Sequence, residues 1–232
     1  LGALLSRFFS GKIADKAGRK VVMIIGTTVT AIAGFLYVLI HYFYTSNQDD
    51  LETGMMGVWL FLGLRFFHGL STGFRPAGSS ALLTDIVPID RRGEALGFLG
   101  VAGNTGMAGG PALGSLLTVE YGYEEMFICS SLLGIVALFL TLKLPETLPN
   151  ARPIRRSDLN VFKGKNFEIS VWPAALSLLP VACAFGVFLT ITPDFVSDLG
   201  YQYKGVFNTI IVVASISMRF VAGKASDRYG RE

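Results

Sequence analysis

Seven apolar stretches, separated by short polar connectors, follow one another along the chain. A bilayer core about 30 Å thick needs roughly 20 helical residues at 1.5 Å each, and the middle five stretches reach that length. The pattern therefore predicts an all-α polytopic membrane protein, and we expect the first stretch to be the end of a truncated helix. The predicted stretches cover residues 1–10, 21–44, 58–87, 95–119, 126–144, 169–193 and 206–222.

Connectors rich in Lys and Arg alternate with connectors that have almost none. The basic ones are 11–20, 88–94, 145–168 and 223–232, whereas 45–56, 120–125 and 194–205 together contain one Lys and no Arg. Basic loops of membrane proteins face the cytoplasm. We therefore expect a multi-pass protein of the cytoplasmic (plasma) membrane, with the basic connectors inside.

One decapeptide occurs twice. Residues 11–20 read GKIADKAGRK, and residues 223–232 read GKASDRYGRE. About six predicted crossings lie between the copies, so both copies face the cytoplasm. This arrangement predicts a parallel repeat of two bundles related by an axis along the membrane normal. We expect residues 1–144 to belong to the N-terminal bundle, 145–168 to form the cytoplasmic loop between bundles, and 169–232 to start the C-terminal bundle.

Composition narrows the function classes. Hydrophobic residues make up 51% of the chain and charged residues only 16%, against about a quarter in soluble domains. The net charge is only +3, and most of the Lys and Arg residues lie in the short connectors, so the sequence has no basic surface typical of nucleic-acid binding. Cys129 and Cys183 lie inside apolar stretches and are expected to pack as small hydrophobic residues. With only two histidines and no metal-ligand spacing, we expect no metal, no cofactor and no enzyme activity.

The first decapeptide resembles the loop signature between the second and third helices of the major facilitator superfamily. The second copy resembles the weaker signature between the eighth and ninth helices, with Glu232 in place of a basic residue, and LPET at 144–147 resembles the end of the sixth helix. The resemblance covers the whole chain. It implies the major facilitator fold, with two six-helix bundles truncated at both ends, from the end of helix 2 to the loop after helix 8.

In that family the loop latches the two halves together on the cytoplasmic side when the carrier is open outward. The resemblance carries this role to Asp15 and to Asp227 in the second copy. A basic turn that only sets topology is the alternative. The predicted latch residues are Gly11, Asp15, Lys16, Gly18, Arg19, Asp85, Arg91, Arg92, Gly223, Asp227, Arg228 and Gly230.

The chemistry of these residues suits a tight turn. Gly18 can adopt a positive φ angle, and Asp15 can cap a helix start or pair with a neighbouring cation. We expect Asp85, at the cytoplasmic end of the third stretch, to join the latch near Asp15 and Arg91 or Arg92. A solvated helix end is the alternative for Asp85.

The apolar third stretch contains Arg65 and Arg75. A charge at membrane depth costs a few kcal/mol, so both should face the bundle interior or a watery cavity. The surroundings of Arg65, with Gly69 four residues on, resemble the fourth-helix motif of proton-coupled facilitators, which implies a coupling role; bonding to backbone carbonyls is the alternative. Arg75 is expected to contact the central cavity. His68 shares a face with Arg65 and could titrate or simply pack.

Gly106, Gly110 and Gly114 recur every four residues, and Pro111 interrupts the same stretch. Small residues at this spacing allow close helix packing, and proline bends a helix. The combination resembles the fifth-helix motif of facilitator antiporters, although Ser115 replaces the last glycine. A generic packing face is the alternative.

The antiporter resemblance favours a secondary transporter that exports small amphipathic or drug-like molecules in exchange for protons. An uptake carrier for a sugar or another metabolite is the alternative within that class, and a seven-helix receptor or a membrane-embedded enzyme is the alternative outside it. The expected partners are the lipid bilayer, a small-molecule substrate and protons, for a carrier that works as a monomer. No buried carboxylate in this sequence is a convincing proton site.

Overall fold

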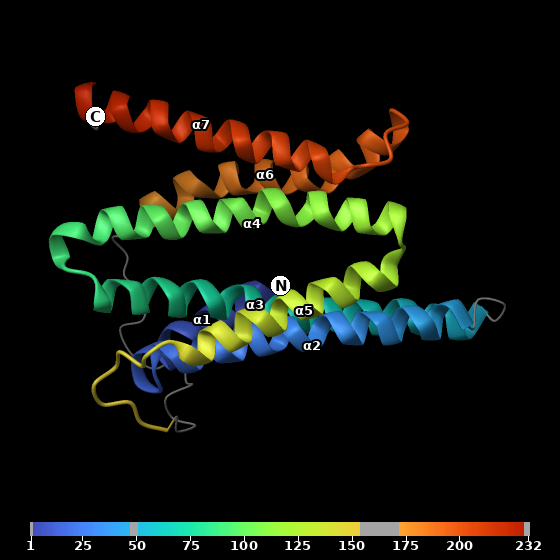
Figure 1. The fold of residues 1–232 in the computed structure, drawn as a ribbon, viewed down its shortest axis with the longest axis horizontal. Coiled ribbons are helices and arrows are strands. Elements are labelled where there is room, and N and C mark those ends of the chain that lie inside the picture. Colours follow the sequence, from blue (N-terminus) through green and yellow to red (C-terminus); the bar gives the residue numbers. More distant parts are fainter. Residues whose placement is uncertain (1, 47–50, 154–171, 230–232) are drawn as a thin grey trace. The chain divides into compact units, whose positions relative to one another are not determined.

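The computed structural model describes residues 2–46, 51–153 and 172–229, and all regular structure within them is helical. Every predicted apolar stretch overlaps one of the helices drawn in Figure 1. A short 3₁₀ turn, Ile89–Arg91, precedes the fourth helix. The α-helices are α1 (Gly2–Lys16), α2 (Arg19–Ser46), α3 (Leu51–Ile86), α4 (Arg92–Glu120), α5 (Tyr123–Lys143), α6 (Trp172–Asp198) and α7 (Gly205–Tyr229).

Three segments in the described part of the chain are long and apolar enough to cross a membrane: α2, α5 and residues 179–198 of α6. Their mean hydropathies are 2.1, 2.1 and 1.7. Helices α3 and α4 are longer, at 36 and 29 residues. They are less apolar because α3 contains two arginines and α4 is rich in glycine.

The predicted length of the first connector is wrong. The sequence predicts a connector over residues 11–20, but the observed connector is shorter, because α1 continues to Lys16 and α2 begins at Arg19. Polar residues at the water boundary remain helical because nothing before Gly18 breaks the helix; Gly18 does, with a φ of 124°. The second copy is likewise helical as far as Tyr229.

Two compact units make up the chain. Unit 1 consists of residues 1–96 and 123–166, and unit 2 of residues 97–122 and 167–232. Unit 1 therefore holds α1, α2, α3 and α5. The predicted bundles divide the chain differently, with 97–122 in the first bundle, and that division stays a prediction.

Small residues let the helices of unit 1 approach closely. Helix α2 packs against both α3 and α5, and α1 packs against α3. A Cβ built on Gly134 of α5 would lie 2.8 Å from Ala31 Cα of α2, and one built on Gly78 of α3 would lie 2.9 Å from the Arg19 carbonyl oxygen. Close backbone approach of this kind is how membrane helices gain packing energy without a hydrophobic driving force.

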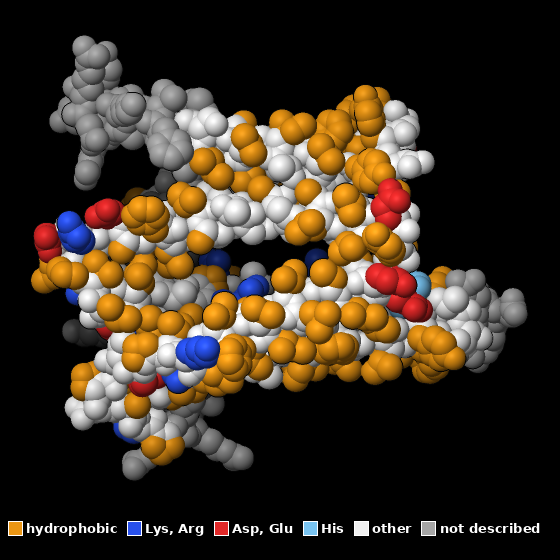
Figure 2. Space-filling model, viewed as in Figure 1, with side chains coloured by type: hydrophobic (Ala, Val, Ile, Leu, Met, Phe, Trp, Pro, Cys, Tyr) orange, Lys and Arg blue, Asp and Glu red, His pale blue; other side chains and the backbone are white. Residues whose placement is uncertain are grey.

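The outward face of α5 is apolar. Leu132, Leu133, Phe139 and Leu140 are each between 54% and 59% exposed, and Figure 2 shows hydrophobic side chains covering this helix. Such a continuous apolar surface would be unfavourable in water. It suits a helix that faces lipid.

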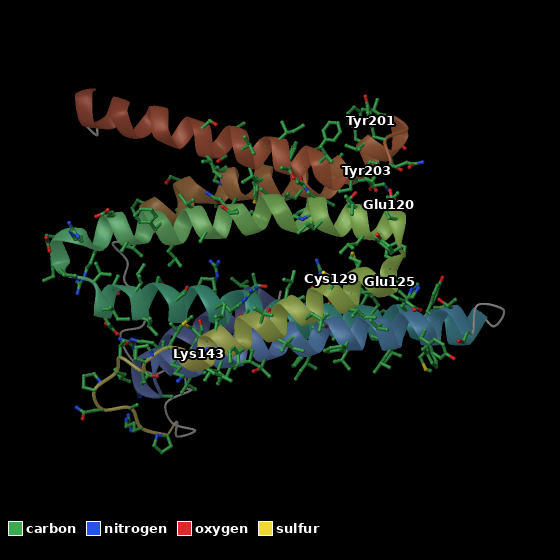
Figure 3. The ribbon with its side chains drawn as sticks, viewed as in Figure 1. Glu120, Glu125, Cys129, Lys143, Tyr201 and Tyr203 are labelled. Carbon is green, nitrogen blue, oxygen red and sulfur yellow. The ribbon has the colours of Figure 1, made fainter. Side chains whose placement is uncertain are left out.

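Within unit 2, polar contacts join α4 to the start of α7 and the connector before it. Thr209 Oγ1 donates a hydrogen bond to the Ala108 carbonyl at 2.8 Å. Tyr203 Oη donates one to Glu120 Oε1 at 2.7 Å, and both residues are labelled in Figure 3. This hydrogen bond and the negative charge of Glu120 raise the pKa of Tyr203.

Gly134→Ala should destabilise unit 1 by about 1–3 kcal/mol, because the added methyl group would press against the α2 backbone at Ala31. Gly63→Ala is the matched control, since a Cβ at Gly63 meets nothing within 4 Å and alanine favours a helix. Thermal unfolding in detergent micelles measures both variants. Equal melting temperatures would contradict the close packing of α2 and α5.

Candidate functional site

The turn between α1 and α2 is formed around Gly18. Its φ of 124° is a backbone conformation that L-residues with side chains rarely adopt. A Cβ on Gly18 would also collide with the carboxylate of Glu146. Glycine is therefore needed at this position for two reasons, the backbone angle and the space for a carboxylate.

Glu146, in the segment that follows α5, caps the start of α2. Its Oε1 accepts a hydrogen bond from the Arg19 backbone N–H at 2.9 Å, and its Oε2 accepts one from Lys20 at 3.1 Å. The backbone N–H groups of Thr147 and Leu148 also donate to Oε1. A carboxylate at a helix N-terminus satisfies free N–H groups and interacts favourably with the helix dipole.

These bonds shift the titration of Glu146. Partial burial by itself raises the pKa of its carboxyl, but the four backbone N–H donors outweigh burial and hold the pKa below its ordinary value. The group is therefore a carboxylate at neutral pH. Lys20 makes a complementary contact, because its Nζ donates to the Leu142 carbonyl at 2.8 Å, near the C-terminus of α5.

Arg19 is the centre of a charge cluster. Its Nη1 lies 2.8 Å from Asp15 Oδ1, and its Nε lies 3.2 Å from Asp85 Oδ2. Thr147 Oγ1 donates to the same Asp85 oxygen at 2.8 Å. We call Asp15, Arg19, Asp85, Glu146 and Thr147 the Arg19 network. It joins the end of α1, the start of α2, the end of α3 and the segment after α5.

The structure thus brings together three predicted latch residues, Asp15, Arg19 and Asp85. Asp15 pairs with Arg19 and does not cap α2, since Glu146 does. Asp85 is joined to Asp15 through their shared partner Arg19. No ion pair links Asp85 to Arg91 or Arg92 among the described residues, where both arginines are exposed, and the nearness of Asp85 to them stays a prediction.

Glu146 and Thr147 were not assigned to the site from sequence. The signal that could have found them is the LPET motif at 144–147, which places a carboxylate directly after a membrane helix. Two other predicted latch residues lie at the end of α1. A Cβ on Gly11 would meet nothing within 4 Å, and the Lys16 carbonyl accepts a hydrogen bond from the Arg152 N–H at 2.9 Å.

The second copy of the motif remains untested. Gly223, Asp227 and Arg228 fall within the last turns of α7. Their side chains are not described, and Gly230 lies outside the described residues. The latch role of these four residues stays a prediction.

The predicted coupling residues all lie on α3. Nδ1 of His68 is 3.4 Å from the hydroxyl of Tyr37, a residue that is only 4% exposed. The Arg75 side chain lies over Gly26 of α2, where an added Cβ would be 2.7 Å from Arg75 Cγ. Arg65 is exposed. His68 and Arg75 therefore contact α2, and their roles in coupling stay predictions.

The glycine face of α4 makes few contacts with described residues. A Cβ on Gly106 or Gly110 would meet nothing within 4 Å. Next to Gly110, the Pro111 carbonyl lies against Gly205 of α7. The role of the antiporter-type residues Gly106, Gly110, Pro111 and Gly114 stays a prediction.

Comparison with known proteins identifies the relatives of this chain. The family model for the Major Facilitator Superfamily matches residues 1–232. The chain is 27% identical over 240 residues to multidrug resistance protein MdtG of Serratia proteamaculans, with 99% of this chain and 54% of the relative covered. It is 28% identical over 148 residues to multidrug resistance protein 1 of Bacillus subtilis, with 63% and 34% covered.

A further relative is the multi-drug resistance efflux pump PmrA homolog of Lactococcus lactis. It is 30% identical over 149 residues, which cover 64% of this chain and 32% of the relative. The chain spans about half the length of the MdtG proteins that it matches. No solved structure matches it significantly.

Glu146→Gln should lower the free energy of unfolding by about 1 kcal/mol at neutral pH, because the amide keeps the shape but not the charge that caps α2. The folded-state pKa of Glu146 is lowered. The stabilisation is therefore complete above the ordinary glutamate pKa of about 4.3 and is lost as pH falls through the lower, folded-state value.

Chemical unfolding of both proteins across this pH range measures the effect. The two stability curves should converge at acidic pH. Glu94→Gln, at an exposed glutamate in the first turn of α4, is the control and should change stability little. A difference for Glu146→Gln that does not depend on pH would contradict the carboxylate cap.

Proposed function

The chain belongs to the major facilitator superfamily, and on that premise we propose that the protein exports small amphipathic, drug-like molecules in exchange for protons. The observation that carries this proposal is the similarity to a multidrug resistance protein along 99% of the chain. The family is one of multi-pass membrane transporters, not of enzymes. The antiporter-type residues of α4, from Gly106 to Gly114, also favour export.

Alternating access supplies the mechanism. Two bundles rock about a central site and expose it to one side of the membrane at a time, so no covalent chemistry is needed. Such a cycle requires contacts at the cytoplasmic face that form in one state and break in the other. The Arg19 network provides a rigid base for contacts of this kind.

We assign the switching contact to Asp15. The Asp15 side chain is 72% exposed although it bonds to Arg19, whose own side chain is only 15% exposed. Arg19 is thus held in place by Asp85 and the Ala14 carbonyl, while Asp15 has room for a further partner. Asp227 is the corresponding residue of the second copy.

Proton coupling is assigned to α3. Arg65, His68 and Arg75 place three basic side chains on one membrane helix, where each charge is costly unless it has a function or a partner. The contact between His68 and Tyr37 offers a path by which protonation could affect the packing of α2 on α3.

Inverted membrane vesicles containing the full-length protein test the proposal. An acidic interior should drive a fluorescent amphipathic cation such as ethidium into the vesicles, and a protonophore should abolish this movement. Asp15→Asn should slow transport about tenfold, equivalent to about 1.4 kcal/mol, through loss of the latch. Asp90→Asn, at an exposed aspartate in the 3₁₀ turn, is the control and should transport normally.

Movement of substrate in the opposite direction would favour the uptake alternative. Transport that is unaffected by the protonophore would refute proton coupling. Asp15→Asn vesicles that transport at the normal rate would overturn the latch role but leave the export proposal standing.

A further inference from the structure

A second feature of unit 1 lies at the end of the helices opposite the Arg19 network. A pocket of about 430 Å³ opens between the C-terminal part of α2 and the N-terminal parts of α3 and α5. Its volume falls within the range of about 300–1,000 Å³ typical of small-molecule sites. Half of the residues that line it are aromatic, namely Tyr37, Tyr44, Phe61, Tyr123 and Phe127.

These rings are held in place by one another. Tyr37 stacks on Phe127 with ring centroids 5.0 Å apart and is tilted against Phe61 at 5.4 Å. His41, which also lines the pocket, lies 5.9 Å from the ring of Tyr123. A pocket whose walls are already packed loses little conformational entropy when a ligand enters.

Two acidic residues lie at the α5 end of this aromatic wall. Glu124 and Glu125 directly follow Tyr123 in the first turn of α5, where Figure 2 shows acidic side chains gathered and Figure 3 labels Glu125. Glu124 precedes Phe127 by three residues and so shares its face of the helix. None of the pocket residues is Lys or Arg, and neither is any residue of the connector 45–56.

We propose that this outer aromatic pocket is a binding site for lipophilic organic cations. The negative faces of aromatic rings attract a cation, and the acidic first turn of α5 favours a ligand of the same sign. The same charges disfavour an anion of equal size. The site goes beyond the proposed export function, because binding here needs neither a proton gradient nor a transport cycle.

Protection of an introduced cysteine from alkylation tests whether a ligand binds in this pocket and which charge the ligand carries. Val58 lines the pocket and is 52% exposed, so Val58→Cys should react with a maleimide. The background carries Cys129→Ala and Cys183→Ala, and the full-length protein is held in nanodiscs. Tetraphenylphosphonium should slow alkylation about tenfold, whereas tetraphenylborate, an anion of similar size, should not. Met56→Cys, at an exposed residue on the side of α3 that faces away from the pocket residues, is the control and should react equally with and without either ion.

Two variant pairs test the mechanism of binding. Gly57→Leu should fill the pocket and abolish the protection, because a Cβ on Gly57 already contacts the Tyr44 ring at 3.0 Å; Gly63→Leu, which points into open space, should preserve it. Glu124→Gln should weaken protection about threefold, and Glu125→Gln should change it less. The unfolding temperature of each variant verifies that it is folded.

Equal protection by both ions would overturn the proposal in favour of an apolar pocket that takes lipid chains. Absence of protection by tetraphenylphosphonium would overturn the proposal outright. Neither result would affect the export proposal, which is measured by transport and not by protection at this pocket.

Discussion

The start of α2 carries backbone N–H groups with no partner in their own helix, and a carboxylate 127 residues away satisfies the first of them. Glu146 can reach Arg19 and Lys20 only because Gly18 leaves space where another residue would place a Cβ. The Arg152 N–H adds a second link, to the end of α1. This long-range cap links the ends of α1 and α2 to the segment that follows α5, and it holds the backbone of Arg19, the residue on which the neighbouring ion pairs centre.

Arg19 extends that constraint to α3. Once its backbone is held by Glu146, its guanidinium is placed between Asp15 and Asp85. One arginine between two carboxylates is favourable because each charge-assisted bond also compensates a charge near the membrane surface. The ends of α1, α2 and α3 are therefore tied together through one guanidinium group.

Local patterns in the sequence were sufficient to predict the helices, because hydrophobic length is a local property, and they left open whether Asp15 caps a helix or pairs with a neighbouring cation, which the structure shows to be Arg19. They could not predict that Glu146 caps α2, because its partners are distant in sequence. They also could not predict where α1 ends, because its last charged residues stay helical. The bond between Asp85 and Arg19 was likewise beyond local patterns, because it depends on the packing of α3 against α2.

Carboxylates at the two ends of unit 1 differ in what they can attract. Asp85 and Glu146 are engaged by Arg19, Thr147 and backbone N–H groups, so they offer little net charge to a ligand. Glu124, by contrast, is exposed in the first turn of α5, the helix that contributes Tyr123 and Phe127 to the pocket, and no lysine or arginine lines that pocket. Cation–π attraction of about 0.5–2 kcal/mol would hold a cation at this end only weakly. Weak retention suits a site that fills and empties without a transport cycle, because affinity differences lie mostly in the dissociation rate and a tightly bound cation would leave slowly.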